Sequence, residues 1–289
     1  MNLQGAFTAI VTPFKKGEVD LKKLIELVEI QITEGIDGIV PAGTTGESPT
    51  LTMDEHIELI QTVVKTVKKR CLVIAGTGAN STAEAVHLTL AARDAGADAS
   101  LQVTPYYNKP TQDGLYRHFM EIADATQIPI VLYNIPGRCG VPIAVETIKK
   151  LSTSKLFVAV KEAGGNAERV SAIVDQCDIT VLSGDDSLTL PMMSLGAKGV
   201  ISVASNIIPS DIKRMVDLAN SNDFSTAMKI NKKFYPLFRD LFIETNPIPI
   251  KAAMAIKGMI EEEYRLPVCE ISEKNRLVLE KTLKACGLI

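Results

Sequence analysis

The residue with the clearest chemical potential in this chain is Lys161, which follows an apolar run. Residues 156–160 are continuously apolar, as is typical of a buried strand, and Lys161 comes directly after them. Burying an ammonium without a partner is costly, so a lysine in such surroundings tends to give up its proton. A neutral amine is a nucleophile that forms an imine with a carbonyl substrate. The alternative is that Lys161 marks where the strand leaves the core, and its position alone favours this second interpretation.

Other polar groups also stand where apolar runs end. They are Gly-Thr-Thr-Gly-Glu at 43–47, Thr-Pro-Tyr-Tyr-Asn at 104–108, Tyr-Asn-Ile-Pro-Gly-Arg at 133–138, Lys-Glu at 161–162, Ser-Gly-Asp-Asp at 183–186 and Ser202. In a closed barrel of parallel strands, the carboxyl ends of all strands meet at one face, where active sites lie. Lys161 then belongs to a group of polar residues, and the catalytic interpretation becomes the favoured one.

Each of these segments has a chemical interpretation and a plainer one. The backbone N–H groups and hydroxyls of residues 43–47 can hold a carboxylate, or can form an ordinary turn. Tyr133 can move protons beside a lysine imine, or simply fill the barrel. Arg138 suits bidentate binding of a carboxylate, or is a solvated loop charge. Tyr106 and Tyr107 are adjacent. Such a pair is typical of an interface or a site, but it can also be simply an exposed pair in a loop.

Eight short apolar runs separated by amphipathic segments form the framework that must position these residues. We predict strands at 6–11, 38–41, 72–75, 99–103, 128–133, 156–161, 179–182 and 199–202. Most of these runs are continuously apolar, as parallel strands covered on both faces should be. The alternation and the count of eight favour an α/β fold of the (β/α)8 TIM barrel type over an open doubly wound sheet.

Helix signals complete the expected architecture. Thr52 with Glu55, and Ser81 with Glu84, have the spacing of capping boxes at helix starts. We predict a catalytic barrel over residues 1–220 and a C-terminal helical appendage over residues 221–289. Within the appendage, an apolar helix face, an interruption at 246–250 and a final helix are expected. The face comprises Phe234, Leu237, Phe238, Leu241 and Phe242, and the final helix carries Leu277, Leu279, Leu283 and Ile289.

Composition narrows the class of protein. The 289 residues are 46% hydrophobic with a net charge of −3, which argues against a nucleic-acid or anionic-membrane partner. The five cysteines are scattered without a Cys-x-x-Cys pair, and His56, His87 and His118 are isolated. This pattern predicts a reducing compartment and no zinc site. Residues 1–5 lack the features of a signal peptide, and no apolar stretch is long enough to span a membrane, so we expect a cytoplasmic protein.

The motifs, in their order and on their predicted strands, resemble those of a known superfamily. Residues 43–47, Tyr-Asn-Ile-Pro at 133–136 and Lys-Glu-Ala at 161–163 resemble signatures of the pyruvate-dependent class I aldolases of the dihydrodipicolinate synthase and N-acetylneuraminate lyase superfamily. The resemblance runs essentially from end to end. Residues 103–110, Arg138 and the Asn-Pro-Ile-Pro-Ile-Lys segment favour its dihydrodipicolinate synthase branch, because sugar-acid lyases typically lack the arginine.

The resemblance implies a metal-independent lyase that needs no cofactor. Such an enzyme condenses pyruvate with L-aspartate 4-semialdehyde to give 4-hydroxy-tetrahydrodipicolinate, in the diaminopimelate and lysine biosynthesis pathway. Lys161 would form the covalent Schiff base with pyruvate. Tyr133, Thr44 and Tyr107 would form the proton relay, with Tyr107 reaching across from a neighbouring subunit.

The resemblance also implies which residues bind the substrates. Thr45 and its turn would hold the pyruvate carboxylate, and Arg138 the carboxylate of the semialdehyde. Gly184 and Ile201 would line the pyruvate pocket through backbone groups. One departure affects nothing central: Gly164 stands where Thr or Ser is common.

Members of the superfamily that are inhibited by L-lysine bind it at a dimer interface. The residues that match this pocket here are Ser48, His56, Asn80, Glu84 and Tyr106, while Met53 stands where such members often carry histidine. Glu84 also has the capping interpretation given above. The resemblance further implies a homo-oligomer, usually a tetramer built as a dimer of dimers. Two rivals stay open: another pyruvate aldolase acting on a sugar acid or sialic acid, and a non-catalytic barrel that binds a small carboxylate.

Overall fold

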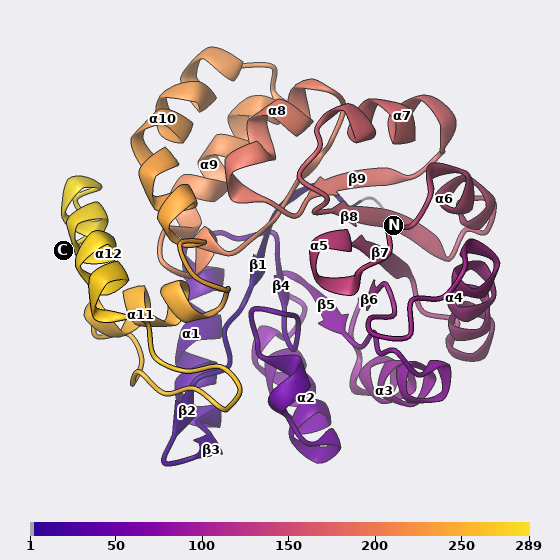
Figure 1. Cartoon of the computed structure of the whole chain (residues 1–289), viewed down its shortest axis with the longest axis horizontal. Helices are drawn as coiled ribbons and strands as arrows, with labels where there is room; N and C mark the ends of the chain where they lie inside the picture. The colour runs from indigo at the N-terminus through magenta and orange to yellow at the C-terminus, as the bar shows by residue number, and fades with distance from the viewer. Residues whose placement is uncertain (1–2) are drawn as a thin grey trace.

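Eight parallel strands close into a barrel with helices packed around it (Figure 1). The computed structural model describes residues 3–289, so the first two residues of the N-terminal segment considered above lie outside it. The barrel order is β1-β10-β9-β8-β7-β6-β5-β4. Its strands are β1 (Gly5–Ala9), β4 (Gly38–Val40), β5 (Leu72–Gly76), β6 (Ala99–Val103), β7 (Ile130–Asn134), β8 (Phe157–Glu162), β9 (Thr180–Ser183) and β10 (Gly199–Ser202). The predicted TIM barrel is confirmed, and every predicted strand is present.

Helices follow the barrel strands and continue beyond the last one. They are α1 (Leu21–Thr33), α2 (Met53–Val67), α3 (Thr82–Ala95), α4 (Gln112–Thr126), α5 (Pro136–Cys139), α6 (Val145–Leu151), α7 (Glu168–Gln176), α8 (Thr189–Ser194), α9 (Pro209–Asn220), α10 (Phe224–Asp240), α11 (Ile248–Ile256) and α12 (Glu273–Ala285). Single 3₁₀ turns lie at η1 (Ser48–Thr50), η2 (Asp186–Leu188) and η3 (Ala204–Asn206). A hairpin of β2 (Phe14–Lys15) and β3 (Glu18–Val19) was not predicted, because two-residue strands leave no periodic pattern. Within residues 3–289, no helix combines the length and the apolar character needed to cross a bilayer.

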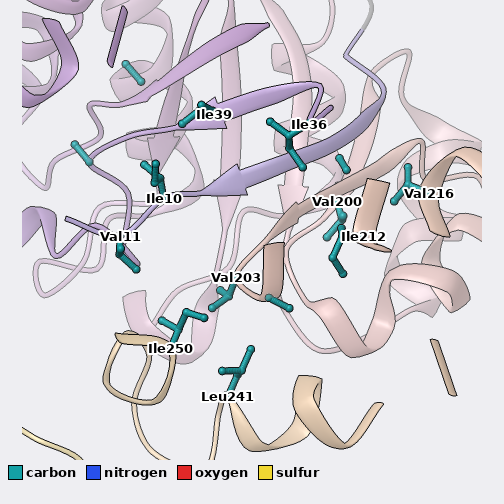
Figure 2. Packing of buried hydrophobic residues seen from close by; sticks show 14 of the residues in the cluster. Ile10, Val11, Ile36, Ile39, Val200, Val203, Ile212, Val216, Leu241 and Ile250 are labelled. Atoms are coloured by element: carbon teal, nitrogen blue, oxygen red, sulfur yellow. The ribbon is translucent and has the colours of Figure 1, made fainter. Parts of the chain in front are cut away.

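Two apolar clusters lie on the two faces of the barrel wall. The inner cluster takes alternate residues from all eight strands, including Ala159 of β8 and Ile201 of β10. The outer cluster lies between strands and helices and includes Val160 and Val200 (Figure 2). Because side chains alternate along a strand, Lys161 shares the inward direction of Ala159, and Glu162 the outward direction of Val160.

The C-terminal helices share the outer cluster with the barrel. Figure 2 shows Leu241 and Ile250 beside Val203, and all three belong to the one apolar cluster. The predicted face of α10 is buried except Phe242, which is 45% exposed. The predicted interruption holds a cis bond between Asn246 and Pro247, but α11 starts straight after it. Proline is tolerated in a first helical turn, which explains why the break is shorter than predicted.

The predicted final helix is present as α12, but not all of its expected apolar residues are buried. Leu279 and Leu283 pack inside, whereas Leu277 is 67% exposed. Ile289 lies beyond the end of the helix and is exposed. The spacing of apolar residues therefore predicted the helix correctly but overestimated its buried face.

Only one of the two predicted capping boxes forms. At the start of α2, the Thr52 side chain accepts from the Glu55 N–H while the Glu55 side chain accepts from the Thr52 N–H. At the start of α3, the Ser81 side chain makes no capping hydrogen bond, so that prediction is wrong. Glu84 is therefore not the partner of a capping box.

The barrel closes where the first strand meets the last. Gly5 of β1 pairs with Gly199 of β10, and a methyl group on Gly199 would stand 1.9 Å from the Gly5 carbonyl oxygen. Gly199 also has φ +157°, a conformation rarely adopted by residues with a side chain. The closure therefore requires glycine at this position.

Gly199→Ala is expected to lower the free energy of unfolding by about 3 kcal/mol or more, because the added Cβ forces β10 away from β1. Chemical denaturation of both proteins measures the difference. Gly137→Ala is the matched control, since no heavy atom lies within 4 Å of the new Cβ there. Equal losses in the two variants would contradict this account of barrel closure.

Candidate active site

Lys161 and Tyr133 lie together inside the carboxyl end of the barrel. The two residues pair in register between β8 and β7, and the Lys161 Nζ lies 4.1 Å from the centre of the Tyr133 ring. Lys161 is 6% exposed and Tyr133 is 4% exposed. The predicted strand ends therefore place a buried amine beside a phenol, and both groups are directed to the barrel interior. This pair has the components for imine chemistry with a nearby proton carrier.

Gly184, after β9, lies directly against the Lys161 side chain. A Cβ at this position would come within 3.0 Å of the Lys161 Cε and 2.7 Å of the Ala163 Cβ. Ile201 of β10 belongs to the same inner cluster as Tyr133. The structure thus brings both predicted pocket residues to the barrel interior, with Gly184 in contact with the lysine.

The turn after β4 supplies the hydroxyl groups. Thr44 and Tyr133 line one small cavity, together with Ser48 and Gly78. Thr45 is buried, and its hydroxyl oxygen accepts a hydrogen bond of 3.0 Å from the Asn246 side chain. Within the turn, the Gly43 carbonyl accepts from the backbone N–H groups of two later residues, which closes it tightly.

Arg138 lies at the rim of the barrel on the short helix α5. Its guanidinium donates to the Asn246 carbonyl oxygen at 2.9 Å, and the residue is exposed. Figure 1 shows α5 over the ends of β7 and β8. Arg138 is therefore close to the strand ends that carry Tyr133 and Lys161, but on the solvent side.

Tyr107 is not brought into this site within one chain. Its side chain is 91% exposed, whereas Lys161 and Tyr133 are buried. Its backbone has φ +71°, an uncommon conformation for a tyrosine. The loop is held by Asn108, whose side chain donates to the Asn80 carbonyl oxygen at 2.9 Å.

A carboxylate network that sequence reasoning missed lies on the outer face of the barrel wall, next to Lys161 and Tyr133. Glu162 is fully buried and accepts from the Asn134 side chain at 2.8 and 3.0 Å, from the Gly164 N–H at 2.8 Å and from the Arg169 Nε at 2.8 Å. Asn134 and Glu162 pair in register one position beyond Tyr133 and Lys161. A buried carboxylate is stable only when it is satisfied in this way, so the network holds β7 and β8 in fixed register.

The comparison with known families decides where the chain belongs. Residues 2–286 match the model of the dihydrodipicolinate synthetase family. The chain is a member of that family. A 4-hydroxy-tetrahydrodipicolinate synthase of Thermodesulfovibrio yellowstonii is 51% identical over 288 residues, covering 99% of each sequence. The superfamily predicted from the motifs is confirmed.

Solved structures of the family have the same fold throughout. The crystal structure of dihydrodipicolinate synthase from Aquifex aeolicus has a TM-score of 0.98 and 51% identity, with 99% of each chain covered. A crystal structure of the enzyme from Cyanidioschyzon merolae with lysine bound has a TM-score of 0.96 and 43% identity, again with 99% of each chain covered. Both structures cover the barrel and the C-terminal helices of this family member.

A second cavity of about 150 Å³ lies next to the first. It is lined by four of the five residues that were predicted to form a lysine pocket, and by Met53. The four are Ser48, His56, Glu84 and Tyr106. The fifth, Asn80, donates to the Tyr106 carbonyl oxygen at 3.3 Å. The His56 Nε2 lies 2.7 Å from the Gly76 carbonyl oxygen, and burial lowers the pKa of the His56 imidazole.

Two further groups near the strand ends were not predicted as partners. Glu47 of the turn forms a buried ion pair with Lys251 of α11, and Asp186 is buried after β9. Both acids were visible in strand-end motifs, but the partner of Glu47 lies 204 positions away and those of Asp186 follow the next strand, 17 and 18 positions on. Among the described residues 3–289, no cluster of three or more His, Cys, Asp or Glu side chains could hold a metal ion.

Asp186 links the ends of β9 and β10, which carry Gly184 and Ile201. Its Oδ2 accepts from the Val203 N–H at 3.0 Å and the Ala204 N–H at 2.9 Å. Burial raises the pKa of the carboxyl from 3.8 to about 6, although these hydrogen bonds oppose the shift. The folded chain therefore favours the protonated acid. The stability that this group contributes is fully present below about pH 4 and is lost as the pH rises through 6.

Asp186→Asn should remove this pH dependence, because the amide stays neutral. Relative to the unsubstituted protein, the free energy of unfolding of the variant is expected to rise between pH 4 and pH 7, by as much as about 3 kcal/mol. Denaturant unfolding at several pH values measures it. Asp124→Asn, at an exposed position of α4, makes the same change of charge without burial. Parallel pH profiles for Asp186→Asn and the unsubstituted protein would contradict the prediction.

Proposed function

We propose that this chain acts as a 4-hydroxy-tetrahydrodipicolinate synthase, a lyase of diaminopimelate and lysine biosynthesis. It condenses pyruvate with L-aspartate 4-semialdehyde through a Schiff base at Lys161. The observation that carries this proposal is the buried Lys161 amine, 4.1 Å from the Tyr133 ring at the barrel mouth. Family membership and a 51% identical relative of that name support the reaction.

In the first half of the reaction, the Lys161 amine attacks C2 of pyruvate, and the carbinolamine loses water to give an imine. Loss of a proton from C3 then gives an enamine. Tyr133 lies beside the amine and Thr44 lines the same cavity as Tyr133, which supports a role for both in carrying these protons. The turn that holds Thr45 offers hydroxyl and N–H groups to the pyruvate carboxylate. Gly184 leaves room for the lysine chain.

In the second half, the enamine C3 attacks the aldehyde carbon of the semialdehyde, and the new alkoxide takes up a proton. The amino group of the bound semialdehyde then attacks C2, which closes the ring and releases the Lys161 amine. Arg138 binds the semialdehyde in this half of the reaction, because its guanidinium at the rim can form paired hydrogen bonds with the carboxylate. Pyruvate and the semialdehyde thus have separate carboxylate sites. No cofactor is required, since the lysine itself carries the covalent intermediate.

The position of Tyr107 bears on the assembly. Its exposure and its positive φ support the proposal that it completes the proton relay in a neighbouring subunit. We therefore propose a homo-oligomer, a tetramer formed as a dimer of dimers. We also propose a cytoplasmic location, and a division into a catalytic barrel at 1–220 and a helical region at 221–289.

Borohydride reduction in the presence of pyruvate tests the chemistry. The reduced imine should leave a three-carbon adduct on Lys161, which peptide mass spectrometry locates. Lys161→Arg should abolish the adduct, because the guanidinium cannot act as the amine nucleophile. Tyr133→Phe should lower kcat by about 10²-fold or more through loss of a proton carrier. If the unsubstituted protein forms no adduct with pyruvate, every imine mechanism for this chain is excluded.

We also propose that the second cavity binds L-lysine as a feedback inhibitor. Glu84 in the lining offers negative charge to the lysine ammonium groups, and a relative has been crystallised with lysine bound. Ser48 and Gly78 line both cavities, so a ligand in one contacts residues of the other. This shared wall supports inhibition transmitted from the lysine cavity to the catalytic cavity.

Millimolar L-lysine is therefore expected to lower the rate of condensation. Glu84→Gln should shift the inhibition curve to at least about tenfold higher lysine, because hydrogen bonds to a charged group contribute about 1.5–3 kcal/mol. Each curve is normalised to the activity of the same variant without lysine. A rate that stays constant in millimolar L-lysine would remove the proposal of feedback, without affecting the proposed reaction.

A further inference from the structure

A fully buried ion pair joins the turn after β4 to the C-terminal helices. The Lys251 Nζ lies 2.5 Å from the Glu47 Oε1, and neither side chain has any exposed surface. Glu47 ends the turn that contains Thr44 and Thr45, and Lys251 lies on α11. The two residues are 204 positions apart in the chain.

Groups around this pair stabilise both of its charges. The Lys251 ammonium lies 4.3 Å from the centre of the Phe14 ring and 5.1 Å from that of the Tyr264 ring. Aromatic faces attract a cation, and the attraction is stronger where water is excluded. The second carboxylate oxygen of Glu47 accepts from the Arg265 N–H at 3.4 Å. Burial lowers the pKa of Lys251, and the Glu47 charge opposes this shift.

Stability alone is a weak reason for such a pair. The cost of removing two charges from water consumes most of their attraction, and apolar replacements of similar size are often neutral or stabilising. Where buried ion pairs have a demonstrated use, they select one conformation over others.

The turn that the pair holds has an uncommon backbone conformation. Glu47 adopts φ +54° and ψ +36°, a left-handed conformation that is uncommon for a residue with a side chain. The turn is also held at Thr45, whose hydroxyl accepts from Asn246. Asn246 and Lys251 lie five positions apart, so one short segment of the C-terminal region holds the turn at two points. The same segment accepts a hydrogen bond from Arg138.

We propose that Glu47 and Lys251 are positioning residues, and that their ion pair holds the turn at 43–47 in the conformation that binds the pyruvate carboxylate. Neither Glu47 nor Lys251 lines the cavity that Thr44 and Tyr133 line, so the proposed role is exerted through the turn and not by direct contact with substrate. The identity of the ligand rests on the proposed function above. The positioning role of the pair, by contrast, follows from the contacts in this structure alone.

The test compares Lys251→Met with the double variant Glu47→Gln plus Lys251→Met. The single variant leaves a buried carboxylate without its cation and can fail to fold. The double variant removes both charges and is expected to stay folded. In the double variant, KM for pyruvate should rise at least about tenfold while KM for the semialdehyde changes less than about twofold. The pyruvate concentration that half-saturates borohydride trapping should rise by the same factor.

Amide hydrogen exchange provides a measurement that needs no substrate. The Gly46, Glu47 and Ser48 N–H groups donate within the turn at 3.1, 3.1 and 3.3 Å. Their exchange should accelerate at least about tenfold in the double variant, while amides of β4 keep their protection. Arg239→Met is the matched control, because it removes an ion pair with the buried Asp240 in the same C-terminal region, and neither residue is hydrogen-bonded to the turn. This control should change neither turn exchange nor KM for pyruvate.

The outcomes separate the two proposals. Unchanged exchange of the turn amides in the folded double variant overturns the positioning role, whatever the substrate is. Faster exchange together with an unchanged KM for pyruvate overturns the link to the pyruvate carboxylate. Faster exchange in a protein whose unsubstituted form traps no pyruvate supports the positioning role and overturns the proposed reaction.

Discussion

The closure of the barrel in a single register is the constraint on which the rest of the structure depends. With β1 paired to β10, all eight strands run in one direction, so their carboxyl ends surround one opening. The same register directs Lys161 and Tyr133 inward and Asn134 and Glu162 outward. A shift by one residue would exchange these directions and place a carboxylate where the amine now lies. The geometry of the candidate site and the fold are therefore specified by the same pairing.

The sequence predicted the parts of the molecule that depend on local patterns. Strands buried on both faces appear as continuous apolar runs, and the cap at Thr52 lies three residues from its partner. The contact between Lys161 and Tyr133 follows from these strands once the barrel closes. The hairpin at Phe14 was not foreseen, because two-residue strands leave no periodic pattern. The early start of α11 was missed because proline is tolerated in a first helical turn, and the spacing at Ser81 did not ensure that the cap forms.

Contacts between residues far apart in the chain could not be predicted from a single sequence. Glu47 and Lys251 were both visible in motifs, yet nothing in their composition indicates that they pair. The hydrogen bond from Asn246 to Thr45 likewise spans 201 positions. Tyr107 presents the opposite case, since its motif pointed to the site but one chain leaves it in solvent. Sequence patterns therefore indicated which residues matter more reliably than which residues meet.

Buried carboxylates beside the barrel mouth are stabilised in three different ways. Glu162 receives hydrogen bonds from two side chains and a backbone N–H, Glu47 faces an ammonium, and Asp186 caps two backbone N–H groups. Each arrangement joins chain segments that would otherwise move independently. The hydrogen bonds and the ion pair that these groups make favour one arrangement of the backbone and so help to pre-organise the site.

The unequal burial of the site has a consequence for how such enzymes diverge. Lys161 and Tyr133 lie inside the barrel, where any change of volume disturbs packed neighbours. Arg138 is an exposed residue on a helix of four residues, and exposed positions tolerate substitution far better. Under the proposed mechanism, substitutions at the rim can therefore exchange the aldehyde partner while the imine chemistry is kept. On the same proposal, a duplicated gene for such a barrel would keep its nucleophile and diverge first at its rim.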